Sequence, residues 1–156
     1  MTERTINTRV KEYTYDELSA EDRALVEAAR QATRGSYAPY SHFNVGAALL
    51  LENGQIIKGA NQENAAFGAG TCGERSALYG AAANYPDQAV IKIAVTAFTR
   101  GDFVHEPCAP CGICRQAMIE FETKSHRPMQ VMLVGRDRVL VVDSARDLLP
   151  LVFFEF

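Results

Sequence analysis

Three of the four cysteines in this 156-residue chain lie within seven positions of one another, in the stretch PCAPCGICRQ. They are Cys108, Cys111 and Cys114, which form two overlapping CxxC pairs. The fourth, Cys72, stands in the stretch CGER, two residues before Glu74. In a reducing compartment, clustered cysteines are more often metal ligands or catalytic groups than structural disulfides. Redox and metal chemistry are therefore both open at this point.

Each cysteine stretch is predicted to open a helix. Residues 72–84 are alanine-rich, and Pro110 suits the entry to a second helix because its missing N–H costs little there. A helix N-terminus offers unpaired N–H groups and the positive end of the macrodipole, which favour thiolate over thiol. Two such termini directed at one spot bring Cys72, Cys111 and Cys114 around a soft divalent cation. Tetrahedral zinc is the expected occupant, with one ion per chain.

Three protein ligands leave a fourth position for water, which is the layout of a catalytic zinc site. Glu74, in the first turn of its helix, is placed to move protons beside that water. Three thiolates give the site a net negative charge, and Arg75 is expected to withdraw charge by hydrogen-bonding the sulfurs. Arg115 is the second candidate for that role. Cys108 lies upstream of Pro110 and is predicted to be a loop cysteine near the site.

The elements that must position these residues follow from periodicity and turn signals. Asn-Gly at positions 53–54, between two apolar runs, predicts a hairpin. Helices are expected at 19–33, at 72–84, from 111 through 121 and briefly after 144, and strands at 45–51, 55–60, 89–98, 129–134 and 138–142. This order favours one α/β domain, a three-layer α/β/α sandwich with a mixed five-stranded sheet. Residues 1–18 are predicted to form an N-terminal arm of uncertain structure and residues 19–156 a single catalytic domain.

Composition is that of an ordinary soluble globular protein, with 47% hydrophobic and 22% charged residues. The net charge of −3 lacks the basic excess that marks most nucleic-acid and membrane-surface binders. The N-terminal residues do not resemble a signal peptide, and no apolar run approaches the roughly 18 residues of a membrane span. A cytoplasmic protein with neither a nucleic-acid partner nor a membrane is expected.

Five sequence blocks carry a resemblance to a known family. TCGERSA, PCGICRQ, SHFNVGAAL, GANQENAAFG and LLPLVF resemble blocks of the small cytidine deaminases and occur in the family order. The first two contain the C-x-E and P-C-x-x-C parts of the zinc deaminase signature. The chain resembles the short, homotetrameric, three-cysteine type of the cytidine and deoxycytidylate deaminase family.

The resemblance implies an activity and a set of substrate contacts. Cytidine and deoxycytidine would be hydrolysed, with zinc, to uridine and deoxyuridine plus ammonia, as in pyrimidine salvage. Asn61 and Glu63 match the pair that binds the ribose 3′-hydroxyl, and Phe43 matches the aromatic packed against the base. The backbone N–H of Gly73 matches the donor to the pyrimidine O2. Phe153 matches an aromatic that reaches the active site of a neighbouring subunit, so a homotetramer with shared sites is expected.

Three other functions compete with this one. A related deaminase of another base or nucleoside analogue, such as a blasticidin-type enzyme, shares the zinc centre. The residues that distinguish it are Phe43, Asn61 and Glu63, which here favour a ribonucleoside. A polynucleotide or transfer-RNA deaminase commonly has a histidine ligand and a basic surface. A noncatalytic zinc module or a CxxC redox protein would use Cys108 as a fourth ligand and would not need Glu74.

Overall fold

The computed structural model describes residues 1–153, so the last three residues of the predicted catalytic domain lie outside the described part. A seven-stranded sheet has the order β1-β7-β6-β4-β2-β3, and β5 pairs with β4. The β4–β6 pair is parallel and the other pairs are antiparallel. The strands are β1 (Lys11–Thr14), β2 (Asn44–Leu51), β3 (Ile56–Ala60), β4 (Val90–Thr99), β5 (Asp102–Phe103), β6 (Gln130–Val134) and β7 (Arg138–Val142).

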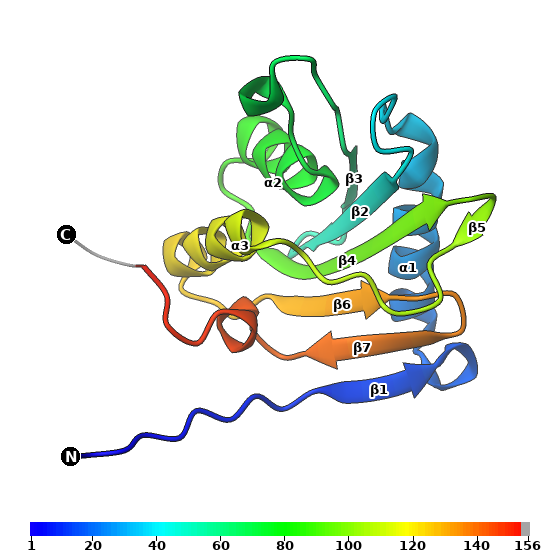
Figure 1. Ribbon diagram of the computed structural model, residues 1–156. Coiled ribbons are helices and arrows are strands. Elements are labelled where there is room, and N and C mark those ends of the chain that lie inside the picture. Colours follow the sequence, from blue (N-terminus) through cyan, green and yellow to red (C-terminus); the bar gives the residue numbers. More distant parts are fainter. Residues whose placement is uncertain (154–156) are drawn as a thin grey trace.

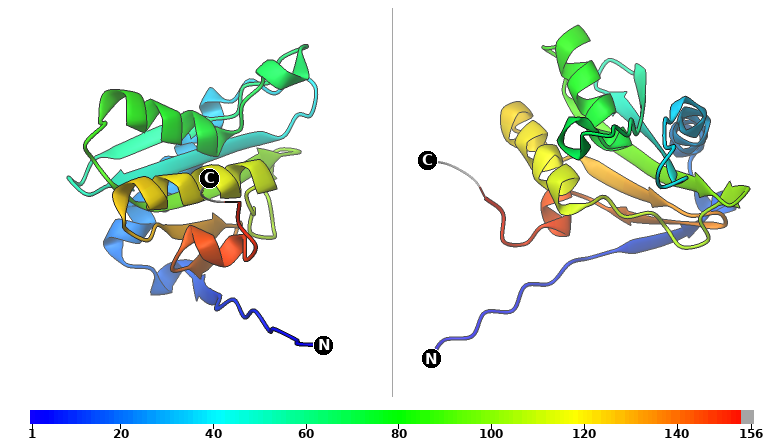
Figure 2. Two further views of the ribbon diagram at one scale, coloured as in Figure 1. Left: turned by 90° about the vertical axis from the view of Figure 1, so that its left-hand side faces the viewer. Right: turned by 45° about the horizontal axis from the view of Figure 1, so that its top comes forward.

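Three α-helices cover the two faces of the sheet (Figures 1 and 2). They are α1 (Ala20–Ala32) on one face, and α2 (Gly73–Asn84) and α3 (Gly112–Ser125) together on the other. The alternation of side chains along β2 divides the core accordingly. Ala48 and Leu50 pack with Leu25 of α1, whereas Leu49 packs with Leu78 of α2. The predicted three-layer α/β/α sandwich with a mixed sheet is confirmed.

Two short strands beyond the five expected ones extend the sheet. β1 lies in the stretch predicted to be an arm, and it pairs with β7 through Lys11 and Val141. β5 closes a tight hairpin with β4 at Arg100 and Gly101, whose φ angles are 54° and 86°. Positive φ at both central residues suits the twist of a two-residue hairpin. The helix expected after Ser144 is a 3₁₀ turn, η4 (Ala145–Leu148).

Gly59 on β3 lets α2 lie close to the sheet. A Cβ at this position would collide with the backbone nitrogen of Ala77 and would lie 2.6 Å from the carbonyl oxygen of Gly73. Only glycine therefore permits this separation between helix and strand. The approach fixes the start of α2, and with it Cys72, against the edge of the sheet. None of the helices within residues 1–153 has the length and apolar character that crossing a bilayer requires.

A buried carboxylate ties together the segments that follow α3. Glu122 is 5% exposed. Its Oε1 accepts hydrogen bonds from the backbone N–H of Met129 at 2.6 Å and of Ala145 at 2.8 Å. The Ser144 hydroxyl donates to the same carboxylate at 2.9 Å. The two buried backbone N–H groups would lose this acceptor without Glu122, which makes this side chain a fixed point of the fold.

Glu122→Ala is expected to lower the free energy of unfolding by about 3 kcal/mol, because it leaves buried backbone donors without an acceptor. Urea unfolding of the metal-loaded protein measures this loss. The matched control is Glu120→Ala on the exposed face of the same helix, for which a change within about 0.5 kcal/mol is expected. Equal stability of the two variants would contradict the role given to Glu122.

Candidate active site

Three cysteine sulfurs meet where α2 and α3 begin. Cys72 is the N-cap residue of α2 and Cys111 that of α3, while Cys114 lies in the first turn of α3. The Sγ atoms of Cys72 and Cys111 are 4.0 Å apart, and those of Cys111 and Cys114 are 3.6 Å apart. All three sulfurs lie within 4.8 Å of one another. The predicted convergence of two helix N-termini is present.

The spacing of the sulfurs fits a metal ion better than it fits disulfide chemistry. A zinc ion about 2.3 Å from each ligand sets tetrahedral sulfurs about 3.8 Å apart, close to the distances between these Sγ atoms. A disulfide would need a separation of about 2.05 Å, and all four cysteines are free thiols. Two helix N-termini add unpaired N–H groups and positive dipole ends that favour thiolates. Cys72, Cys111 and Cys114 therefore form a set of donors suited to zinc.

The thiols of Cys72 and Cys114 affect each other's ionisation. Hydrogen bonding from the Cys114 thiol, and more weakly from Arg75, lowers the pKa of Cys72 to about 5 although burial opposes it. The hydrogen bond to Cys72, together with burial, raises the pKa of Cys114. One thiolate therefore forms readily and makes the next one more costly. A divalent cation at the centre reverses that opposition, because each further thiolate then meets positive charge.

Glu74 and Arg75 flank the sulfur cluster with opposite charge. Glu74 is 4% exposed, and burial raises the pKa of its carboxyl. Its Oε2 is buried without a hydrogen-bond partner within residues 1–153, which is unusual for a native polar atom. Arg75 Nη2 lies 3.9 Å from the Sγ of Cys72. Two consecutive residues thus supply a carboxyl group that can exchange a proton and a guanidinium group that can withdraw negative charge from the sulfurs.

Cys108 and Arg115 lie beside the cluster without joining it. Burial raises the pKa of the Cys108 thiol to about 11, and within residues 1–153 Cys108 is not part of the group of sulfurs that could share a metal ion. Arg115, the second candidate for contact with the sulfurs, donates instead to the carbonyl oxygens of Pro110 and Leu148, each at 2.8 Å. It braces the turn that precedes Cys111.

A cavity of about 680 Å³ opens above the sulfurs. Cys72, Glu74 and Arg75 contribute to its lining, together with the predicted substrate residues Phe43, Asn61 and Glu63. Phe43 is 36% exposed and Asn61 is 8% exposed. Residues from the loop before β2, from the end of β3 and from the start of α2 are thus brought together around one space. Its size suits a small molecule that carries both apolar and polar groups.

Two of the predicted substrate-binding residues, Gly73 and Phe153, lie outside this lining, as does the predicted metal ligand Cys114. Gly73 is the first residue of α2, so its backbone N–H is one that intrahelical bonding cannot use. Phe153 is 67% exposed, and Gln116 Nε2 donates to its carbonyl oxygen at 2.8 Å. A role for Phe153 in this chain's own cavity has no support in the geometry, and its role in a neighbour's cavity stays a prediction.

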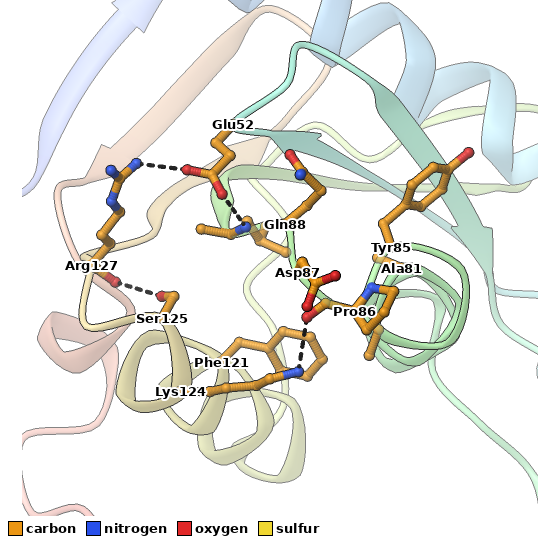
Figure 3. Close-up of a pocket in the computed structure, with 13 residues that line it drawn as sticks. Glu52, Ala81, Tyr85, Pro86, Asp87, Gln88, Phe121, Lys124, Ser125 and Arg127 are labelled. Atoms are coloured by element: carbon orange, nitrogen blue, oxygen red, sulfur yellow. Dashed lines mark hydrogen bonds and ion pairs between the residues drawn. The ribbon is translucent and has the colours of Figure 1, made fainter.

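A second hollow, of about 410 Å³, lies between the C-terminal ends of α2 and α3 (Figure 3). Three of its charged side chains, those of Glu52, Lys124 and Arg127, are engaged with nearby protein groups. Arg127 pairs with Glu52 at 3.0 Å, and Lys124 donates to the carbonyl oxygen of Pro86 at 3.3 Å. The described residues that line it include neither cysteine nor histidine. This hollow has no donor set comparable to the sulfur cluster.

Comparison with known proteins assigns the chain to a family. The family described as "Cytidine and deoxycytidylate deaminase zinc-binding region" matches residues 19–128, which include all three clustered sulfurs and Glu74. The chain belongs to the cytidine and deoxycytidylate deaminase family. The predicted resemblance is confirmed. The family description names zinc, and the cluster of Cys72, Cys111 and Cys114 is compatible with a zinc site.

Individual deaminases support this assignment over most of the chain. A cytidine deaminase of Halalkalibacterium halodurans is 48% identical over 98 residues, which are 62% of this chain and 68% of the relative. One of Sporosarcina psychrophila is 41% identical over 129 residues, 83% of this chain and 88% of the relative. The crystal structure of a cytidine deaminase from Burkholderia pseudomallei superposes with a TM-score of 0.70 at 46% identity, and the match covers 83% of this chain and 97% of the other.

Several residues around the deaminase cavity were not predicted from the sequence. Tyr40, Ser41 and Phe67 line it, and Tyr40 and Phe67 make an edge-to-face contact with ring centroids 6.5 Å apart. Tyr40 and Ser41 lie in a turn, and Phe67 begins the short 3₁₀ helix η3 (Phe67–Ala69). In segments this short, no periodicity marks a side chain as facing a pocket. For Tyr40 and Ser41, the position after Pro39 and beside the predicted Phe43 was the one available signal.

The zinc content of cysteine variants is expected to distinguish the three clustered cysteines from Cys108. Cys108→Ser is expected to retain about one zinc per chain, because the remaining three sulfurs complete the protein ligand set. Cys111→Ser is expected to lose most of its zinc during dialysis against a weak chelator, because only two sulfurs remain. Elemental analysis of the purified variants measures both. Loss of zinc from Cys108→Ser would instead indicate a closed, structural four-cysteine site.

Proposed function

We propose that this chain catalyses the hydrolytic deamination of cytidine and deoxycytidine to uridine and deoxyuridine, with release of ammonia. The observation that carries the proposal is the position of the three sulfurs and the buried Glu74 carboxyl at one cavity of nucleoside size. Family membership and the names of the relatives support the same substrate class.

Cys72, Cys111 and Cys114 would hold the zinc ion, which supplies a Lewis acid that makes a bound water more acidic near neutral pH. Arg75 lies close enough to Cys72 Sγ to draw charge from the sulfurs, which counteracts the excess negative charge of three thiolates. Arg115 contributes by holding the Pro110 carbonyl and so the turn before Cys111.

Glu74 moves the protons of the reaction. Its carboxylate takes a proton from the attacking water and delivers it to N3 of the pyrimidine, while the water oxygen bonds to C4. The same carboxyl then transfers the remaining hydroxyl proton to the exocyclic amino group. The bond between C4 and that nitrogen then breaks, which releases ammonia and gives the 4-keto product. A pKa raised by burial suits a group that must both accept and donate a proton.

The cavity walls would orient the nucleoside. Phe43 would pack against the base, and the backbone N–H of Gly73 would donate to the pyrimidine O2. Asn61 and Glu63 would meet the ribose 3′-hydroxyl, because an amide N–H and a carboxylate oxygen together suit a group that accepts and donates.

We further propose a cytoplasmic homotetramer in which Phe153 completes a neighbouring subunit's cavity. Exposed apolar side chains support burial by another copy, since Phe67 and Leu151 are each 85% exposed. Free thiols at the proposed metal site suit a reducing compartment. The net negative charge supports a nucleoside rather than a nucleic acid as substrate.

Purified enzyme is expected to convert cytidine to uridine, with loss of the cytidine absorbance, and Glu74→Gln is expected to lower kcat/KM by about 10²–10⁴-fold because it removes the proton carrier. Zinc content should stay at the wild-type level in this variant. A panel of deoxycytidine, adenosine, guanine and blasticidin defines the substrate class. Turnover of another member of the panel without turnover of cytidine would overturn the proposal.

Mixed tetramers test the shared active site. Phe153→Ala and Glu74→Gln are each expected to be impaired alone, because one lacks the aromatic donated to a neighbour and the other lacks the proton carrier. Co-expression of the two variants is expected to give more activity than either parent, because some sites then combine an intact Glu74 with a neighbour's intact Phe153. Activity of the mixture equal to the average of the parents would place Phe153 outside the neighbour's site.

A further inference from the structure

The loop that carries Phe43 is attached to the end of β3 by the side chain of Asn61. Asn61 Oδ1 accepts from the Val45 N–H at 2.8 Å and from the Ser36 hydroxyl at 2.5 Å. Asn61 Nδ2 donates to the Phe43 carbonyl oxygen at 2.9 Å. Both lone-pair positions of the amide oxygen are therefore occupied by the protein. One N–H of the amide remains for a ligand in the cavity.

Glu63 holds the middle of the same loop. Its Oε2 accepts from the Tyr40 N–H at 2.9 Å and from the Ser41 N–H at 3.2 Å. The Ser41 hydroxyl in turn accepts from the Phe43 N–H at 3.1 Å. Backbone bonding continues the attachment, because the Glu63 N–H donates to the Tyr37 carbonyl at 2.8 Å. A chain of hydrogen bonds thus runs from Glu63 through Ser41 to Phe43.

The loop needs this external support because its own backbone is not in a low-energy conformation throughout. His42, between Ser41 and Phe43, has φ 55°, in the left-handed region that residues other than glycine adopt at a cost. Its N–H donates to the Ala38 carbonyl at 3.0 Å, which closes a single turn. The loop has no regular secondary structure between Tyr40 and Phe43. Bonds from outside the loop must therefore keep it in place.

We propose that Glu63, assisted by Asn61, is a positioning residue for the nucleobase: it holds the loop that sets Phe43 against the base. This inference rests on the proposed function, and it adds a second role to a residue expected to contact only the sugar. Glu63 Oε2 supports the loop through two backbone N–H groups, while Oε1 accepts no backbone N–H within residues 1–153. The same carboxylate thereby links binding of the sugar to the placement of Phe43 against the base.

The loop stabilises the ionised, carboxylate form of Glu63. Hydrogen bonds from the Ser41 side chain and from the Tyr40 N–H hold the pKa of Glu63 below its usual range. A glutamine carbonyl oxygen can also accept two hydrogen bonds, as Glu63 Oε2 does here. The two roles of Glu63 are therefore separable by substitution: Glu63→Gln keeps an acceptor for the loop but not the carboxylate, and Glu63→Ala removes both.

The test measures loop order and base binding without the sugar. Hydrogen exchange of the zinc-loaded enzyme is followed over residues 37–45, and the Kd of 1-methylcytosine, which has no sugar hydroxyl, is measured by calorimetry. Glu63→Ala is expected to accelerate hydrogen exchange in this segment about tenfold and to raise the Kd of 1-methylcytosine about fivefold. Glu63→Gln is expected to stay near wild type in both measurements while its KM for cytidine rises. Glu120→Ala serves as the matched control.

An unchanged affinity of Glu63→Ala for 1-methylcytosine would overturn the inference, because Glu63 would then serve the sugar alone. Equal acceleration of exchange in residues 46–51 of β2 and in β4 would also overturn it, since the effect would be a general loss of stability. Absence of cytidine turnover by the wild-type enzyme would overturn the proposed function instead. The exchange measurement needs no substrate, so it still reports whether Glu63 holds the loop.

Discussion

The site depends on two helices that begin at the same point above one sheet. The parallel pairing of β4 with β6 requires a crossover, and α3 is that crossover, so its N-terminus lies at the end of the sheet where α2 begins. Gly59 allows α2 to approach β3 closely enough to complete the meeting. The three sulfurs then surround one point, where the positive ends of two helix dipoles favour the thiolate form. Glu74 and Arg75 take their places simply by following Cys72 along the first turn.

α3 is held at both ends by different chemistry. Its N-terminus carries Cys111 and Cys114, two of the three sulfurs suited to hold zinc, while Glu122 near its C-terminus accepts hydrogen bonds from the backbone N–H groups of Met129 and Ala145. Between these points Met118 and Ile119 are buried against the sheet. A helix fixed at both ends and along one face cannot shift along its axis, and this holds Cys111 and Cys114 at constant height relative to Cys72.

The sequence predicted the parts of this structure that have local signatures. The Asn-Gly hairpin and the CxxC pair of Cys111 and Cys114 each depend on neighbours in the chain. The hairpin is confirmed, and the sulfurs of this pair lie close to that of Cys72 as predicted. β1 was not predicted because its partner β7 lies more than a hundred residues away, and a short mixed-polarity stretch has no period of its own. The carboxylate contacts of Glu63 and Glu122 were missed for the same reason. Their donors are backbone groups, which every residue carries and no residue type reveals.

The short strand β1 also changes what the sheet presents to other molecules. Without it, β7 would end the sheet, and its sequence RVLVV would offer unpaired backbone groups beside apolar side chains. Such an edge is a template for pairing with strands of other chains. β1 instead ends the sheet with four residues that include Lys11 and Glu12, charges that disfavour further strand addition. The segment that precedes the family's matched region thus protects the folded enzyme against aggregation through its sheet edge.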